Sequence, residues 1–242
     1  MRHILFIGAT DKTDLLFYIS KVLATVGKRV LIVDATDQQK HSYSIPHITK
    51  GNLITEYDGF DVATGFEKQN KGIHEILQHY LKNKNERLES YEYILLDTDS
   101  EEFLSEVPKA PWNDVHSHVL ITNCERFTIE RNVEILESYV KGHDDIPFVR
   151  VQYPFVDSHV KEDYLNSVLS HLKIQFDEDR EFEFYYDEVN YATKVNNQFE
   201  SRVYLKPLSR QAKKALYELI KTITTEDSNT IKAAFKIAEK GK

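Results

Sequence analysis

Several features that would assign a function at sight are missing from this chain of 242 residues. Its single cysteine, Cys124, allows neither an intramolecular disulfide nor a cysteine-based zinc site. No apolar run approaches the roughly 18 residues that a membrane span needs. Because the first residues enter a strand-like run directly, we expect no signal peptide, and a reducing, cytoplasmic location.

An excess of basic charge is also missing, because the formal net charge is -8. Because a net negative charge repels the phosphate backbone, we do not expect nucleic acid as a partner. The end of the chain differs, since residues 228–242 carry four lysines and one glutamate, a net charge of +3. Ile231, Ala234, Phe235 and Ala238 lie there at helical spacing. We therefore expect a single domain over residues 1–227, followed by a basic amphipathic helix over residues 228–242.

Two roles remain open for that helix. It docks on the domain or on a partner protein, or it attaches the protein to a membrane. Only Ile231 and Phe235 are large on its apolar face, which is little for stable membrane binding. Docking is therefore the favoured role.

The common motifs of several enzyme classes are absent too. The sequence has no GxSxG nucleophile elbow and no GxGxxG dinucleotide fingerprint. The histidines form no HExxH or other close metal-binding pattern. These absences disfavour a serine hydrolase, a Rossmann dehydrogenase and a zinc protease.

Short apolar runs alternate with amphipathic helical patterns along most of the chain. This succession predicts an α/β fold, a doubly wound and mostly parallel sheet with helices on both faces. We expect Asp37–Asn52 and Asp177–Arg202 to be irregular, and the acidic run Asp177–Glu188 to be a solvated face. Strands are expected at His3–Gly8, Arg29–Ala35, Asp58–Thr64, Tyr91–Thr98, Ser117–Asn123 and Pro147–Phe155, and helices at Lys12–Val26, Gly72–Leu88, Phe127–Lys141, Val160–Leu172 and Leu208–Thr225.

Polar residues follow the expected strands, where an open parallel sheet binds its ligands. The first strand is followed by GATDKTD (Gly8–Asp14) and the second by DATDQQ (Asp34–Gln39). The strand at Tyr91–Thr98 reads YEYILLDT, so Asp97 lies at its end and Asp99 follows directly after it. These segments are the places to look for chemistry.

In this order and spacing, the segments resemble the ParA/MinD family of P-loop ATPases, which includes TadZ-like proteins. The family's first loop reads GKGGxGKT, and here Phe6–Thr13 reads FIGATDKT. The family's VDxDPQ is similar to VDATDQ (Val33–Gln38), and its YDYIIID is similar to YEYILLD (Tyr91–Asp97). The resemblance covers about His3 to Tyr139, with a weaker continuation to Thr225.

This resemblance implies a nucleotide site with named residues. Gly8, Asp11, Lys12 and Thr13 would surround the phosphates, and Thr13 and Asp97 would hold magnesium. Asp34 and Asp97 would be the catalytic carboxylates, and Gln152 would stand nearest the family's adenine-reading asparagine. The alternative is structural: Lys12 and Thr13 begin an ordinary helix capped by Asp11 or Thr10, and Asp34 and Asp97 cap turns at strand ends.

Two departures from the family pattern weaken ATP chemistry. Asp11 replaces the glycine before the lysine, which places a carboxylate where phosphates would lie. Ile7 replaces the signature lysine, which in the family reaches the nucleotide of a partner subunit. We therefore predict a degenerate pseudo-ATPase, a scaffold or localising protein with little or no ATPase activity.

Its expected partners are a protein or a weak homodimer, and ATP with Mg²⁺ is an open but weakened possibility. The alternatives are an active, atypical ATPase that positions DNA, a pilus or a secretion machine, and a membrane-attached regulator. The resemblance also predicts that His3–Gly8 and Tyr91–Thr98 are parallel neighbours in the sheet. Asp97 would then lie close to Lys12 and Thr13.

Overall fold

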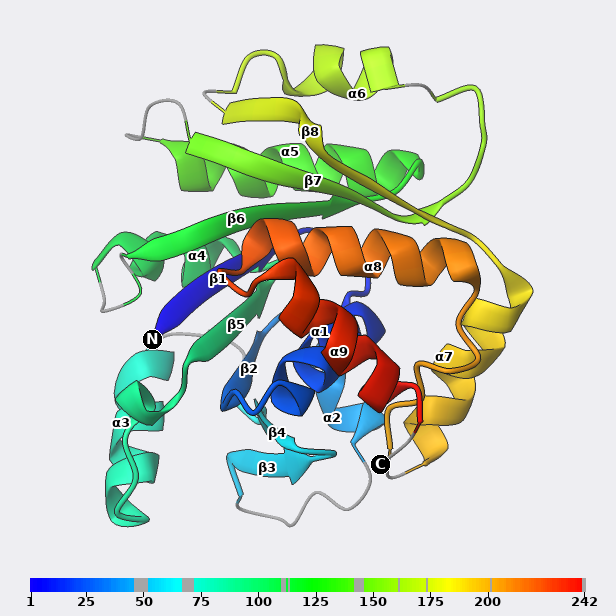
Figure 1. Cartoon of the computed structure of the whole chain (residues 1–242). Coiled ribbons are helices and arrows are strands. Elements are labelled where there is room, and N and C mark those ends of the chain that lie inside the picture. The colour runs from blue at the N-terminus through cyan, green and yellow to red at the C-terminus, as the bar shows by residue number, and fades with distance from the viewer. Residues whose placement is uncertain are drawn as a thin grey trace.

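The computed structural model describes residues 1–45, 52–66, 72–109, 112, 114–141, 146–160, 162–172, 174–200 and 202–240. Within them, eight strands form one sheet in the order β3-β4-β2-β5-β1-β6-β7-β8 (Figure 1). Only β3 is antiparallel to its neighbour. The strands are β1 Arg2–Ile7, β2 Val30–Ala35, β3 Ile54–Tyr57, β4 Phe60–Ala63, β5 Tyr93–Thr98, β6 Val115–Thr122, β7 Ile146–Phe155 and β8 Ile174–Tyr185.

The strand neighbours agree with the prediction made from the sequence. β1 lies between β5 and β6 and is parallel to both, so the predicted pairing of His3–Gly8 with Tyr91–Thr98 is confirmed. β2 is the other parallel neighbour of β5. The carboxyl ends of β1, β2 and β5 therefore meet at one edge of the sheet, and the loops that follow them share that edge.

Helices cover both faces of the sheet, so the predicted doubly wound α/β fold is confirmed (Figure 1). Alternate residues of β1 show the two layers: Ile4 and Phe6 pack with α1, α8 and α9, whereas Leu5 and Ile7 pack with α3, α4 and α5. The helices are α1 Thr13–Thr25, α2 His41–Ser44, α3 Ile73–Asn83, α4 Glu101–Glu106, α5 Arg126–Val140, α6 Glu162–Leu169, α7 Glu188–Phe199, α8 Arg210–Ile223 and α9 Ser228–Ala238, with 3₁₀ turns η1 Leu88–Ser90 and η2 Val107–Lys109.

The expectation of irregular structure over Asp177–Arg202 was wrong. The edge strand β8 and the helix α7 occupy most of that segment. Within the acidic run, Phe182 and Phe184 alternate with Glu181 and Glu183, and this period of two is the pattern of a half-buried strand. Phe184 is buried, and Glu181 is ion-paired with the buried guanidinium of Arg150. The acids therefore belong to a structured sheet edge and not to a solvated loop.

Two smaller expectations also needed correction. The single strand expected at Asp58–Thr64 is the second arm of a hairpin, β3 and β4, whose turn contains Asp58 and Gly59 at positive φ. The segment Asp37–Asn52 contains the short helix α2, and its residues 46–51 lie outside the described part.

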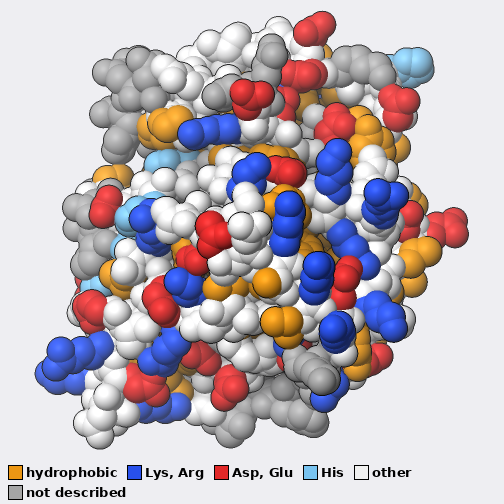
Figure 2. All heavy atoms as spheres, in the orientation of Figure 1, with side chains coloured by type: hydrophobic (Ala, Val, Ile, Leu, Met, Phe, Trp, Pro, Cys, Tyr) orange, Lys and Arg blue, Asp and Glu red, His pale blue; other side chains and the backbone are white. Residues whose placement is uncertain are grey.

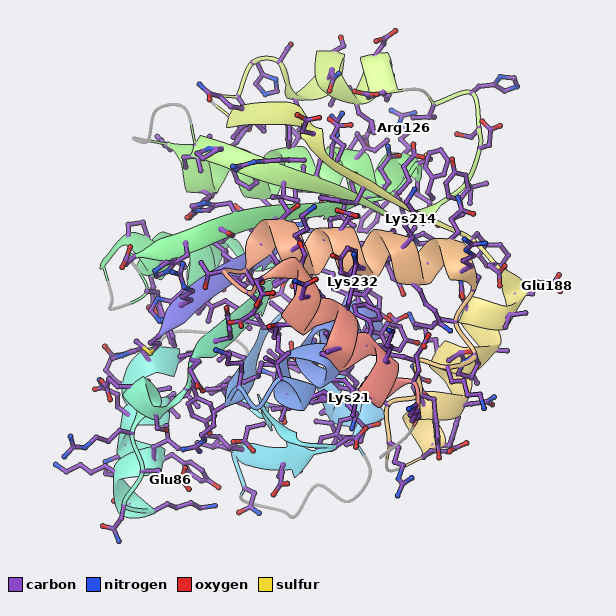
Figure 3. All side chains as sticks on the ribbon, in the orientation of Figure 1. Lys21, Glu86, Arg126, Glu188, Lys214 and Lys232 are labelled. Carbon is purple, nitrogen blue, oxygen red and sulfur yellow. The ribbon has the colours of Figure 1, made fainter. Side chains whose placement is uncertain are left out.

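The basic C-terminal segment forms α9, which Asp227 caps by accepting hydrogen bonds from the N–H groups of Asn229 and Thr230. Ile231, Ala234, Phe235 and Ala238 are buried in the core shared with α1 and α8. Lysine side chains such as Lys232 and Lys214 lie on the outer side of α9 and α8 (Figures 2 and 3). In this conformation the apolar face of α9 is covered by the protein itself. Among the described residues, no helix combines the length and the apolar character that crossing a bilayer requires.

Candidate functional site

Two carboxylates lie side by side at the carboxyl edge of the sheet. Asp34 ends β2 and Asp97 ends β5, and the two residues are register partners on these parallel strands. Register partners project to the same face of a sheet. Both side chains are fully buried. Because buried carboxylates need compensating charge or hydrogen bonds, the residues around them define the chemistry of this edge.

Lys12 supplies part of that compensation. Its Nζ lies 2.9 Å from Asp97 Oδ1, and both side chains are about 2% exposed or less. The same ammonium donates hydrogen bonds to the carbonyl oxygens of Gly8 at 2.5 Å and Thr10 at 3.3 Å. Its donors are thus directed back into the loop that carries it, and the predicted proximity of Asp97 to Lys12 is confirmed.

His41, at the start of α2, lies between the two carboxylates. Its Nδ1 is 3.1 Å from Asp34 Oδ2, and its Nε2 is 3.6 Å from Asp97 Oδ2. Thr36 donates a hydrogen bond from its hydroxyl to Asp34 Oδ1 at 2.6 Å, and the backbone N–H of His41 donates to Asp34 Oδ2. We call Lys12, Asp34, His41 and Asp97 the buried charge cluster.

The pKa directions in this cluster follow from burial and from the opposite charges. Burial alone would lower the pKa of His41, but the carboxylates of Asp34 and Asp97 raise it above the usual value. Burial would raise the pKa of Asp34, yet His41 and Thr36 bring it below the usual value. For Asp97, burial outweighs the attraction of Lys12 and His41 and raises the pKa to about 6. With His41 protonated, two cations balance two carboxylates and no metal ion is required for neutrality.

A second ion-paired group lies at the start of α1. Asp11 turns toward α7, where its Oδ2 accepts a hydrogen bond from Lys194 Nζ at 3.2 Å. Lys194 Nζ is also 3.3 Å from Asp14 Oδ1, and Tyr153 donates its hydroxyl hydrogen bond to Asp14 Oδ2. Asp11 Oδ1 accepts from the Thr13 N–H at 3.1 Å, as a residue that caps a helix does. Burial alone would raise the pKa of Asp11, but Lys194 and Thr13 hold it well below its usual value.

The backbone of the loop Gly8–Lys12 is fixed by its neighbours. Gly8 has a φ of +147°, and a Cβ there would lie 2.1 Å from the carbonyl oxygen of Ile121. Asn132 of α5 accepts a hydrogen bond from the Ala9 N–H at 2.8 Å and donates to the Ile121 carbonyl at 3.1 Å. Gly8 is thus required by close packing of the loop against β6.

The residues assigned from the sequence are only partly brought together. Gly8, Asp11, Lys12, Thr13, Asp34 and Asp97 meet at this edge. Gln152 is buried in the second half of β7, two strands away from β1, and is not among the residues that line the loop cavity. Arg126, at the start of α5, is exposed and pairs with Glu130 (Figure 3).

The arrangement does not fit magnesium with a nucleotide. Lys12 is committed to Asp97 and to loop carbonyls, and His41 lies between the carboxylates that would share the metal. The cavity between the loop, Lys40 and Asp99 measures about 30 Å³, the space of a water or two. Among the described residues, no group of three or more His, Cys, Asp and Glu side chains is placed to hold a metal ion.

Two partners in this site are not predicted by the sequence. Lys194 lies some 180 positions after Asp11, in a segment expected to be irregular, so no local pattern points to their pairing. The sequence alone indicates only a solvated or core role for His41. Its position seven residues after Asp34, beyond a strand end, is the one available signal that it returns to that carboxylate.

Comparisons with known proteins agree with this architecture. No protein-family model matches the sequence, and no curated protein is significantly similar to it. Among solved structures, the chain is similar to MinD of Pyrococcus horikoshii in complex with Mg-ADP, with a TM-score of 0.57 and 16% identity over 93% of this chain and 96% of that one. MinD from the MinC:MinD complex of Aquifex aeolicus gives 0.54 and 17%, over 94% and 97%. A single-residue variant of McdA from Cyanothece in complex with ATP gives 0.50 and 14%, over 98% and 96%.

The chain therefore has the fold of the ParA/MinD-type P-loop ATPases. The resemblance noted in the sequence is confirmed at the level of the fold.

Proposed function

We propose that this protein is a pseudo-ATPase of the ParA/MinD type that acts as a scaffold or localising protein through protein partners. The observation that carries the proposal is the buried charge cluster. Lys12 and His41 neutralise Asp97 and Asp34 within the chain, at the place where the fold would use a nucleotide and a metal.

The position of Asp11 supports the same conclusion. Any phosphate group entering the loop would approach its carboxylate, and two unit charges about 4 Å apart repel by about 1 kcal/mol in water and several-fold more in a drier site. Lys194 stabilises this carboxylate in its ionised form. The negative charge therefore persists at neutral pH and opposes an anionic ligand.

The proposal of a protein partner is based on the fold. The similar MinD chain from Aquifex aeolicus was solved in a complex with MinC. The fold thus supports a surface for protein recognition, and the internal neutralisation of this site removes the need for nucleotide to complete the edge. We propose that partner binding is constitutive here.

An active but atypical ATPase is the second candidate, because Lys12, Thr13, Asp34 and Asp97 do meet at one edge. Titration with ATP and with ADP, each with and without Mg²⁺, separates the two. We expect the wild type to bind neither nucleotide measurably at millimolar concentration, and Asp11→Gly to gain affinity because it removes the carboxylate. Lys232→Ala, remote on α9, is the matched control.

A Mg²⁺-dependent affinity in the wild type that Lys12→Ala abolishes, together with turnover near the enzymatic median of about 10 s⁻¹, would refute the proposal. Binding without turnover would support the scaffold role but place it under nucleotide control.

A further inference from the structure

A cavity of about 230 Å³ lies at the carboxyl ends of β7 and β8, the edge at which sheets of this class bind ligands. Residues of α1, α7 and α8 form its other walls, and it shares no lining residue with the cavity of the first loop. An engineered apolar cavity of about 150 Å³ binds benzene, so this volume accommodates one ring with a short side chain. We call it the tyrosine pocket, after Tyr18, Tyr153, Tyr185, Tyr186 and Tyr191 in its lining.

The pocket has a buried apolar floor and an exposed aromatic mouth. At the floor, Phe184 and Leu216 are buried, and the ring of Phe184 meets that of Tyr153 edge to face at 5.5 Å. At the mouth, Tyr186 and Tyr191 are each more than half exposed, and their ring centroids are 6.3 Å apart. Large aromatic rings left in solvent around an enclosed floor are typical of a binding site and not of a closed core.

The polar side chains of the lining are already engaged within the chain. Hydroxyl and amide groups that could orient a polar ligand interact instead with neighbouring side chains or with the backbone. The pairs are Tyr18 with Asn197, Tyr153 with Asp14, Tyr185 with Glu183, and Asn190 with Ser209. A polar ligand would have to break one of these contacts or bury its own polar atoms without partners, and either is costly.

The charged groups of the lining oppose a ligand of either sign. Lys194 Nζ lies 3.3 Å from Asp14 Oδ1 and 3.2 Å from Asp11 Oδ2, so a ligand ammonium at Asp14 would meet the ammonium of Lys194. An anion would meet the carboxylates of Asp14 and Asp187, and Asp187 already caps α7. An uncharged ligand meets neither repulsion, and it gains from burial against the apolar floor.

We propose that the tyrosine pocket binds an uncharged, apolar molecule with a single aromatic ring. The ring lies against Phe184 and Leu216 at the floor, and Tyr186 and Tyr191 cover it at the mouth. Aromatic rings in contact prefer edge-to-face or offset arrangements, and the tyrosines around the pocket offer both edges and faces. The proposal is independent of the pseudo-ATPase role, because it concerns a different cavity and a ligand without phosphate.

The test uses the full-length protein and three probes of similar shape in isothermal titration calorimetry: uncharged ethylbenzene, cationic benzylammonium and anionic benzoate. In both ions the charge is so close to the ring that burying the ring also desolvates the charge. We therefore expect ethylbenzene to bind at least tenfold more tightly than either ion. An ion that binds as tightly as ethylbenzene, or no binding of ethylbenzene up to its solubility limit, overturns the proposal. Displacement of ethylbenzene by ATP also overturns it, because the pocket would then belong to a nucleotide.

Two variants locate the site. Ala212→Phe fills the pocket from α8 and should abolish ethylbenzene binding, whereas Ala233→Phe, exposed on α9, should leave it unchanged. Tyr191→Ala removes an exposed ring at the mouth and should weaken binding several-fold, whereas Tyr43→Ala removes an exposed ring outside the pocket and should not. Thermal unfolding shows whether each variant is folded. If ethylbenzene binds a folded Ala212→Phe, or binds Tyr191→Ala as tightly as the wild type, the ligand lies elsewhere and the assignment is wrong.

Discussion

Replacing Lys12 by alanine should destabilise the protein in the absence of any ligand, and by more at pH 8 than at pH 6. If Lys12 served only to bind phosphate, its removal would change the stability of the free protein little. Here its ammonium is about 2% exposed and pairs with the buried Asp97. Removing one partner of a buried ion pair typically costs about 3–5 kcal/mol, and the carbonyls of Gly8 and Thr10 also lose their donor.

The pH dependence follows from Asp97. Its pKa of about 6 lies above the value of 3.8 for a free aspartate. In the wild type, ionisation of Asp97 therefore lowers the stability of the folded state as the pH rises from about 4 to 6, and it lowers the stability no further above pH 6. Without Lys12 the pKa rises further, and the loss continues to higher pH. The difference in unfolding free energy between the two proteins should therefore grow by up to about 1.4 kcal/mol per pH unit above pH 6. Groups that titrate alike in both proteins cancel in this difference.

Urea unfolding of both proteins at pH 6, 7 and 8 measures the effect, and the double variant Lys12→Met/Asp97→Leu should regain much of the lost stability. Lys21→Ala is the matched control, because Lys21 belongs to the same helix and pairs with Asp58, but both side chains are partly exposed (Figure 3). It should cost about 1 kcal/mol at every pH. A cost below about 1 kcal/mol for Lys12→Ala, or one that does not change with pH, would refute the internal neutralisation of this site.

Three further predictions test other parts of the structure. Burial lowers the pKa of His3 and of His74, so both favour the neutral form when folded. Their contribution to stability should be fully present above about pH 6.5 and be lost as the pH falls below it, and this part of the acid dependence should weaken in the His74→Gln variant during urea unfolding. Gly8→Ala should destabilise by about 3 kcal/mol or more, because the added Cβ meets the Ile121 carbonyl at positive φ; a Tm shift below about 3 °C contradicts this. Sedimentation at low and high salt, with and without Mg²⁺, should reveal at most a weak dimer that salt or divalent cation tightens, and a strong dimer at low salt without Mg²⁺ would contradict the repulsion on which this expectation rests.

The sheet was predictable because its strands carry their burial in the sequence. The runs around Ile4 and Leu95 are continuously apolar, as central strands covered on both faces must be. β8 was missed because seven acids lie between Asp177 and Glu188, and their charge was given more weight than the alternation of Phe182 and Phe184. In a sheet edge, one side of the strand faces water, so a strand can be acidic and structured together.

The site was predictable only in part, for a different reason. The motif placed Lys12, Asp34 and Asp97 at one edge, and the register of β2 and β5 did the same in the structure. The motif could not predict which ion pairs these side chains form. Those pairs depend on His41 of α2 and on Lys194 of α7, and neither residue lies at a fixed sequence distance from the first loop.

The ion pairs of the site also determine how the four carboxylates near the first loop act on a second molecule. As a sequence, Asp11, Asp14, Asp34 and Asp37 form an acidic group that would repel its own copy across a two-fold axis. In the structure, Asp34 is buried and paired with His41, whereas Asp11 and Asp14 share the single cation Lys194. The repulsion expected from the sequence is therefore reduced within one chain but not removed, because one cation serves two carboxylates. A partner that approaches this edge meets a loop that keeps net negative charge, so basic groups or a divalent cation between the two molecules would favour contact.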